Sequence, residues 1–184
     1  YTTLFRSNRT ATIDETVDDV LLLFGGTDPS QLAEKSLAAL EELGFKGQVN
    51  VVRGLGADPI DFSKYSLSLN PLSNVKNMPP LMAQADIALS SAGRTITELA
   101  CIGVPTVCMA QNDKELTHTH TTEANGVVML GLGNDVSVEQ LAGTLRELIA
   151  DSGKRKQLSA NALHATENRS NTKVVERILE KLFS

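Results

Sequence analysis

Three loops in this sequence carry residue types suited to binding a phosphorylated, hydroxyl-rich ligand. The first loop, Gly25-Gly26-Thr27-Asp28, directly follows the apolar run at residues 20–24. Glycines let a backbone approach a ligand closely, and the start of a following helix offers free N–H groups to an anion. Glycine at a strand-to-helix turn can equally serve a steric purpose, so this loop alone leaves both interpretations open.

The second loop lies between the apolar run at residues 87–89 and a segment with helical spacing. It brings together small, hydroxyl-bearing and charged residues: Ser91, Gly93, Arg94, Thr95 and Glu98. Arg94 at the start of a helix would add positive charge for a phosphate, and the carboxylate of Glu98 could accept two hydrogen bonds from a ribose diol. The pattern Thr95-x-x-Glu98 is also a capping box, so a purely structural role for Glu98 remains open.

The third loop contains two amide side chains, Gln111 and Asn112, directly after the apolar run that ends at Met109. Amide side chains at the end of a strand can read the hydroxyl groups of a sugar through both donors and acceptors. The alternative is an ordinary polar loop at the start of a helix.

Other patterns in the chain carry less chemistry. Gly54 and Gly56 are not followed by a third glycine that opens a helix, so the dinucleotide-binding fingerprint is incomplete. His118 and His120 are two residues apart and would point to different faces of a helix, which disfavours a shared metal ion. No nucleophile and base occur in the pattern of a catalytic triad. We therefore expect no catalytic residue, metal ion or cofactor in this chain.

Strand-like and helix-like segments alternate along the sequence. The expected strands are residues 20–24, 49–52, 65–69, 87–89, 104–109 and 127–130. The expected helices are residues 29–43 (with Asp28 as N-cap and Gly44 as stop), 78–84, 95–102, 114–124, 138–150 and 174–183. Short, wholly apolar runs are typical of strands that are buried on both faces.

Repeated β-α units build parallel sheets. The sequence therefore predicts an α/β fold: a Rossmann-like parallel sheet with helices on both faces. Such sheets bind ligands at the carboxyl ends of their strands, where the three loops lie.

The composition limits the classes of partner. A chain of 184 residues with 41% hydrophobic content can build one ordinary domain. A net charge of −5 without a Lys/Arg cluster argues against nucleic acid. No apolar run is long enough for a transmembrane segment. Cys101 and Cys108 lie in apolar surroundings, which is typical of free thiols in a reducing compartment, and we expect a cytoplasmic protein.

The first seven residues, YTTLFRS, can be encoded by the end of a widely used sequencing adapter. We expect residues 1–7 to be a read-through artefact on a truncated gene, with the natural domain at residues 8–184. A natural, frayed N-terminus is the alternative.

Taken together, the loops resemble the C-terminal domain of the GT-B glycosyltransferases of family 28, which include the enzyme that adds N-acetylglucosamine to lipid I. The resemblance rests on GGTDP at 25–29, MAQADIALSSAG at 82–93, TITEL at 95–99 and GVP at 103–105. It is strongest to the UDP-sugar hydrolase of pseudaminic acid synthesis and to spore-coat polysaccharide proteins, and it spans about residues 18–180.

The resemblance implies roles for individual residues. Glu98 would hold the ribose hydroxyls, Gly93, Arg94 and Thr95 would face the diphosphate, and the loop at residues 25–28 would face the sugar phosphate. Two departures stand out. Arg94 replaces a residue that is often small or apolar in relatives, and the polar loop at 111–113 is out of step with the relatives' amide pairs, which leaves the sugar undefined.

The resemblance further implies a UDP-sugar-binding domain of a bacterial enzyme that transfers or hydrolyses a glycosyl group in surface polysaccharide or nonulosonic acid biosynthesis. The catalytic base and the acceptor site would lie on an N-terminal domain that is absent here, so this domain alone is expected to be inactive. A stand-alone nucleotide- or sugar-binding module without catalysis is the alternative.

Overall fold

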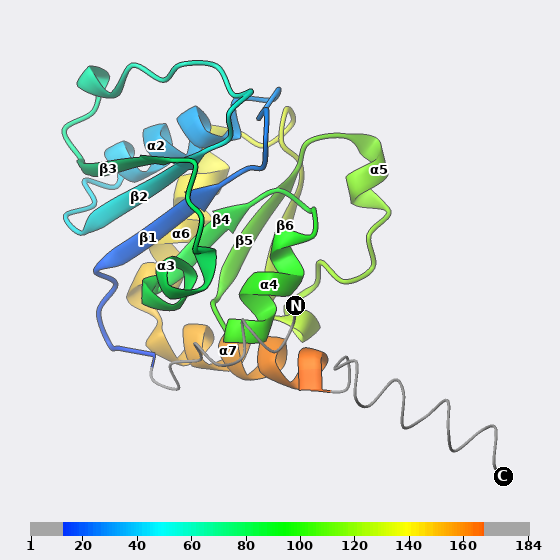
Figure 1. The fold of residues 1–184 in the computed structure, drawn as a ribbon. Helices are drawn as coiled ribbons and strands as arrows, with labels where there is room; N and C mark the ends of the chain where they lie inside the picture. The colour runs from blue at the N-terminus through cyan, green and yellow to red at the C-terminus, as the bar shows by residue number, and fades with distance from the viewer. Residues whose placement is uncertain (1–12, 168–184) are drawn as a thin grey trace, which may run out of the picture.

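The computed structural model describes residues 13–167 and contains a single six-stranded sheet (Figure 1). All strand pairs are parallel, and the order across the sheet is β3-β2-β1-β4-β5-β6. The strands are β1 (Asp19–Leu23), β2 (Gln48–Arg53), β3 (Ser68–Ser73), β4 (Ile87–Ser90), β5 (Thr106–Ala110) and β6 (Val127–Leu132). The chain reverses its direction of travel across the sheet between β1 and β4, which is the point where such sheets bind ligands.

Helices cover both faces of this sheet. They are α2 (Leu32–Glu42), α3 (Met78–Gln84), α4 (Thr95–Ile102), α5 (Asp113–Leu116), α6 (Val138–Ala150) and α7 (Ser152–Glu167), with 3₁₀ turns η1 (Phe62–Lys64) and η2 (Glu123–Asn125). Val20 and Leu22 of β1 pack into a core with α2 and α6, whereas Leu21 and Leu23 pack into a second core with α3 and α4. This alternation buries β1 on both faces, and the predicted α/β fold with two helical layers is confirmed.

The expected helix at residues 114–124 is wrong. α5 ends at Leu116, and the next helical turn is η2. Threonines fill the interval, and two of them bond to the local backbone: Thr117 Oγ1 donates to Lys114 O at 2.7 Å and Thr121 Oγ1 to His118 O at 2.8 Å. Hydroxyl groups that bond to the local backbone compete with helix formation, which explains the interruption.

The strand expected at residues 65–69 is shifted to Ser68–Ser73. β3 is an edge strand with mostly exposed side chains, and it contains Pro71. A proline is tolerated at a sheet edge, and the exposed strand needs no continuous apolar run that the sequence could reveal. The predicted helix at 174–183 and the artefact predicted at 1–7 lie outside the described residues.

Between residues 13 and 167, no helix combines the length and the apolar character needed to cross a membrane.

Arg155 is fully buried and joins the segment before β1 to the turn between α6 and α7. Nη1 of Arg155 donates to Leu148 O at 2.7 Å and to Ile149 O at 3.0 Å, both at the end of α6. Nη2 donates to Asp14 O at 2.6 Å and to Glu15 O at 2.9 Å. Hydrogen bonds to backbone carbonyls therefore stabilise the buried charge in place of a carboxylate, and the segment before β1 is held against α7.

Replacing Arg155 by methionine should lower the free energy of unfolding by about 3 kcal/mol, because the carbonyls it serves would lose their donor in a buried place. Urea unfolding followed by circular dichroism measures this. The neighbouring cation provides a control: Lys156 forms an exposed ion pair with Glu15 at 2.5 Å, and Lys156→Met should change stability little. Equal effects of both changes would contradict the role assigned to Arg155.

Candidate functional site

The three loops identified in the sequence lie at the carboxyl ends of three adjacent strands. The loop at residues 25–28 follows β1, the loop at 91–94 follows β4, and Gln111 follows β5 (Figure 1). Since β1, β4 and β5 are neighbours in the sheet, the loops meet at one edge, on either side of the point where the strand order reverses.

The first loop is open to solvent at Gly25, Gly26 and Thr27. Gly25 has a φ of 83°, a conformation that favours glycine, so the fold itself explains this residue. Gly26 lies outside the left-handed region, and a Cβ atom added there would meet nothing within 4 Å. Neither backbone conformation nor crowding explains glycine at this position. The open space beside Gly26 therefore favours the interpretation that a ligand approaches here.

Gly54 and Gly56 pack against the first loop instead of opening a helix of their own. Gly56 N donates to Gly26 O at 3.0 Å, and a Cβ atom on Gly54 would come within 2.2 Å of the same oxygen. Close contact between two backbones therefore accounts for the glycine at position 54. The loop after β2 is further fixed by Arg53, whose Nη2 donates to Ala57 O at 3.1 Å and to Asp58 O at 3.0 Å.

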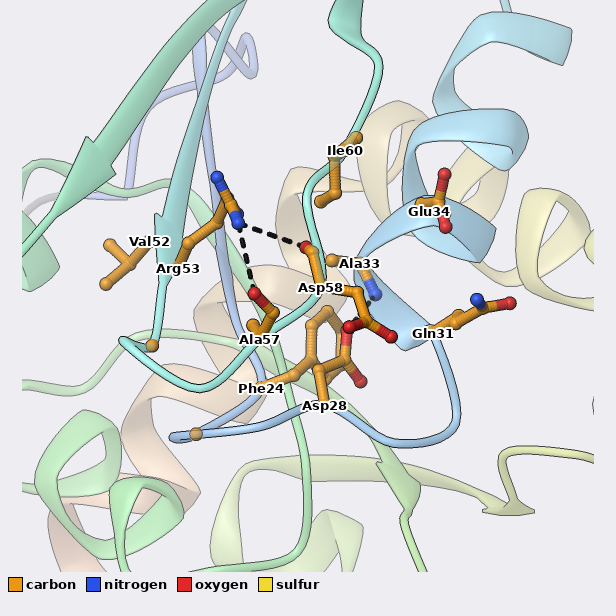
Figure 2. Close-up of a pocket in the computed structure, with 12 residues that line it drawn as sticks. Phe24, Asp28, Gln31, Ala33, Glu34, Val52, Arg53, Ala57, Asp58 and Ile60 are labelled. Carbon is orange, nitrogen blue, oxygen red and sulfur yellow. Dashed lines mark hydrogen bonds between the residues drawn. The ribbon is translucent and has the colours of Figure 1, made fainter.

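A small cavity lies between these two loops and the start of α2 (Figure 2). Its lining includes the carboxylates of Asp28, Glu34 and Asp58 against the single guanidinium of Arg53. An excess of carboxylates disfavours a phosphate by like-charge repulsion. This cavity is consequently a poor place for the diphosphate of a nucleotide.

Asp28 acts within the protein. Its carboxylate accepts hydrogen bonds from Leu32 N at 3.0 Å and Ala33 N at 2.9 Å, and from Gln111 Nε2 at 3.2 Å. The expected helix at 29–43 was placed too early, because the chain turns once more before α2 begins at Leu32. Asp28 still satisfies the helix start, but from four and five residues away. The N–H groups that the first loop was expected to offer an anion are thus already bonded to this carboxylate.

The second loop leads from β4 into α4 with its polar groups arranged differently. Arg94 occupies the N-cap position, and its side chain makes no capping hydrogen bond. Thr95 is therefore the first residue of the helix and not its N-cap, which places Glu98 at the fourth helical position, one beyond the third position that a capping box uses. Ser91 is buried, whereas Gly93, Thr95 and Glu98 are half-buried and Arg94 is exposed. Asp28, whose carboxylate covers the start of α2, makes no hydrogen bond to the start of α4 within the described residues.

In the third loop, Gln111 is used to hold the first loop. Its Nε2 donates to Phe24 O at 2.9 Å and to Asp28, while its Oε1 accepts from Ser30 N at 3.4 Å. Asn112 caps α5 by accepting from Glu115 N at 3.1 Å. Both amides therefore make hydrogen bonds within the protein, as the alternative of a polar loop at a helix start implies. Their contact with a sugar stays a prediction.

Two residues that hold the site together, Glu115 and His118, were not singled out as site residues from the sequence. One oxygen of Glu115, Oε2, accepts from Gln111 N at 2.9 Å and from Ala92 N at 3.2 Å, which joins the second and third loops. Nδ1 of His118 lies 2.6 Å from Ala92 O. The pattern Asn112-x-x-Glu115 resembles a capping box, and this signal could have drawn attention to Glu115.

The site contains no evident nucleophile. Burial, together with the negative charge of Glu115, raises the pKa of the Cys108 thiol to about 12, so this cysteine stays neutral at physiological pH. Within residues 13–167 no group of three or more His, Cys, Asp and Glu side chains is arranged to hold a metal ion.

Comparison with known proteins places this arrangement in a family. The model of the glycosyltransferase family 28 C-terminal domain matches residues 20–178. The spore coat polysaccharide biosynthesis protein SpsG of Bacillus subtilis is 27% identical over 154 residues, which make up 80% of this chain and 45% of SpsG. The UDP-N-acetylglucosamine--N-acetylmuramyl-(pentapeptide) pyrophosphoryl-undecaprenol N-acetylglucosamine transferase of Pediococcus pentosaceus is 25% identical, covering 82% of this chain and 44% of that enzyme. The chain thus spans about half the length of these relatives.

Solved structures share the fold. MurG of Acinetobacter baumannii superposes with a TM-score of 0.66 at 17% identity, over 89% of this chain and 48% of that one. Anabaena HepE in complex with UDP-glucose superposes with a TM-score of 0.65 at 20% identity, over 90% of this chain and 48% of that one. Since the family model covers most of the chain and the fold agrees, the chain belongs to the glycosyltransferase family 28 C-terminal domain family.

Proposed function

We propose that this chain binds the UDP part of a UDP-sugar and forms the nucleotide-sugar-binding half of a glycosyltransferase-like enzyme. The observation that carries the proposal is the start of α4. It lies at the switch point of the sheet, with Gly93 and Arg94 leading into it, and Arg94 at the N-cap position makes no capping hydrogen bond with its side chain. The N-terminus of a helix with a positive side chain beside it suits a diphosphate. Anabaena HepE, which shares the fold, has been solved with UDP-glucose.

The polarity of the site orients the nucleotide. Gly93, Arg94 and Thr95 at the start of α4 would contact the diphosphate, because the start of α2 is bonded to Asp28. Glu98 lies one helical turn further along α4, within reach of a ribose attached to that diphosphate. A carboxylate can accept hydrogen bonds from both ribose hydroxyls, which is the role that the resemblance implied for this residue.

The remaining loops would frame the sugar. Gly26 and Thr27 are exposed, and the space beside Gly26 is open, so the first loop would face the sugar phosphate. Ser91 is buried at the start of the second loop and would help to hold that loop in place. Gln111 and Asn112 would contribute by fixing the loops, since their side chains already bond to the protein.

The whole enzyme would transfer or hydrolyse a glycosyl group in bacterial surface polysaccharide or nonulosonic acid biosynthesis. The names of SpsG and of the peptidoglycan transferase support such a pathway. Both reactions break a bond at or near the anomeric carbon with the diphosphate as leaving group, and the start of α4 would stabilise its growing charge. The catalytic base would come from the other half of the enzyme. The thiols of Cys101 and Cys108 are buried and are not joined in a disulfide, which supports a cytoplasmic site of action.

Titration calorimetry with UDP, UMP and GDP tests the proposal directly. UDP should bind more tightly than UMP, because UMP lacks the second phosphate that α4 would hold. Arg94→Met should weaken UDP more than UMP, whereas Arg146→Met, which removes an exposed arginine from α6, should leave both unchanged. A folded chain that binds none of the three nucleotides would refute the proposal. Preserved binding without catalysis by the complete polypeptide would instead favour a stand-alone binding module.

Glu98→Gln tests the ribose contact. The change should weaken UDP binding by about 1.5–3 kcal/mol, the scale of hydrogen bonds to a charged group, with little change in thermal stability. The variant should also discriminate less than the wild type between UDP and its 2′,3′-dideoxyribose analogue. Glu139→Gln, a matched change in the first turn of α6, provides the control. Undiminished discrimination in Glu98→Gln would move the ribose contact to another residue.

A further inference from the structure

Two side chains from the segment after β5 hold both polar backbone groups of Ala92, at the centre of the second loop. Glu115 Oε2 accepts from Ala92 N at 3.2 Å, and His118 Nδ1 lies 2.6 Å from Ala92 O. Ala92 is itself fully buried. One residue of the loop is therefore fixed at its N–H group and at its carbonyl by side chains from a different part of the chain.

The hydrogen bond to the carbonyl shows which ring nitrogen of the histidine carries a hydrogen. A carbonyl oxygen can only accept, so Nδ1 of His118 must carry the hydrogen. The histidine is held in turn by its own backbone, whose N–H group donates to Glu115 O at 3.2 Å and whose carbonyl accepts from Thr121 Oγ1 at 2.8 Å. Its ring also stacks on His120, with the centroids 5.3 Å apart. The donor is thus presented to Ala92 from a fixed position.

Fixing the carbonyl of Ala92 also fixes the N–H group of Gly93. The two groups belong to one peptide plane, the structure has no cis peptide bond among its described residues, and in a trans peptide they point in opposite directions. The N–H group of Gly93 therefore points away from His118. It makes no hydrogen bond to any of residues 13–167, whereas the carbonyl of Gly93 accepts from Ile96 N at 3.3 Å.

The surroundings of Gly93 leave room for a ligand. A Cβ atom added there would meet only Ser91 Oγ, at 3.9 Å, which is an ordinary contact. The φ of Gly93 is outside the left-handed region as well, so the fold does not demand glycine here. A small residue with an oriented, unbonded N–H group and open space beside it is a suitable donor to an anion.

We propose that His118 is a positioning residue of this site: by holding the carbonyl of Ala92, it aims the N–H group of Gly93 at a phosphate of the bound nucleotide. The identity of the anion rests on the proposed function, whereas the orientation of the peptide does not. His118 itself acts through the backbone of the loop and needs no contact with the ligand.

The experiment compares His118→Ala with His118→Asn in the chain as it exists. The Nδ2 group of asparagine lies close to the place of Nδ1 in histidine and can donate to the same carbonyl. His118→Ala should shift the amide resonance of Gly93 in the ligand-free protein and weaken UDP binding about tenfold, the scale of a lost hydrogen bond to a charged group. In His118→Asn, the amide resonance of Gly93 should lie close to its wild-type position, and the dissociation constant for UDP should stay within about twofold of the wild-type value. His164→Ala, at an exposed site on α7, is the matched control.

The outcomes separate the inference from the proposed function. An unchanged Gly93 resonance and unchanged UDP affinity in His118→Ala would overturn the inference. So would an equal loss of affinity in both variants with the resonance unmoved, because that result indicates a general structural role. If the wild-type chain fails to bind UDP, the proposed function fails, and the Gly93 resonance still decides whether His118 orients the peptide. Melting temperatures of both variants establish that they are folded.

Discussion

The architecture of the site depends on the carboxylate of Glu115, which accepts two backbone N–H groups on a single oxygen. One of these groups belongs to Gln111 at the end of β5 and the other to Ala92 beyond the end of β4. Strand-end loops in an α/β sheet leave backbone groups that the ladder can no longer satisfy, and each buried one needs a partner. Because a charged acceptor makes stronger hydrogen bonds than a neutral one, a single side chain suffices to join two loops.

This connection extends to the first loop through Gln111. Its backbone is held by Glu115, and its side chain bonds to Phe24 O and Asp28. Hydrogen bonds therefore join the three loops, although they come from distant parts of the sequence. The carboxylate of Asp28 bonds to backbone N–H groups at the start of α2, whereas the N-cap residue of α4, Arg94, makes no capping hydrogen bond with its side chain. A carboxylate at a helix start opposes a second anion there, so the two helix starts differ in their electrostatics.

The sequence predicted the sheet and the three loops because those features depend on local patterns. The apolar run of β1 and the glycines that follow it reveal a buried strand and its turn without knowledge of contacts. The roles of Asp28 and Gln111 could not be predicted in this way. A side chain that bonds within the protein and one that binds a ligand can stand in the same local sequence pattern. The contact of His118 with Ala92 was equally hidden, because it joins two strand ends and depends on α5 stopping at Leu116. Only the fold determines these pairings.

The hydrogen bonds around Ala92 also separate what the backbone and the side chains would contribute to the proposed anion site. Gly93 has no side-chain rotamers to lose, and the residue before it, Ala92, is held at its N–H group by Glu115 and at its carbonyl by His118. A donor that is already oriented requires no ordering on binding, which favours both affinity and the stabilisation of a developing charge. Arg94 is different, because its exposed side chain must lose rotamer freedom to reach a phosphate. In the proposed site, the backbone of the second loop would supply the fixed part of anion recognition, and Arg94 would supply charge that can adjust to the ligand.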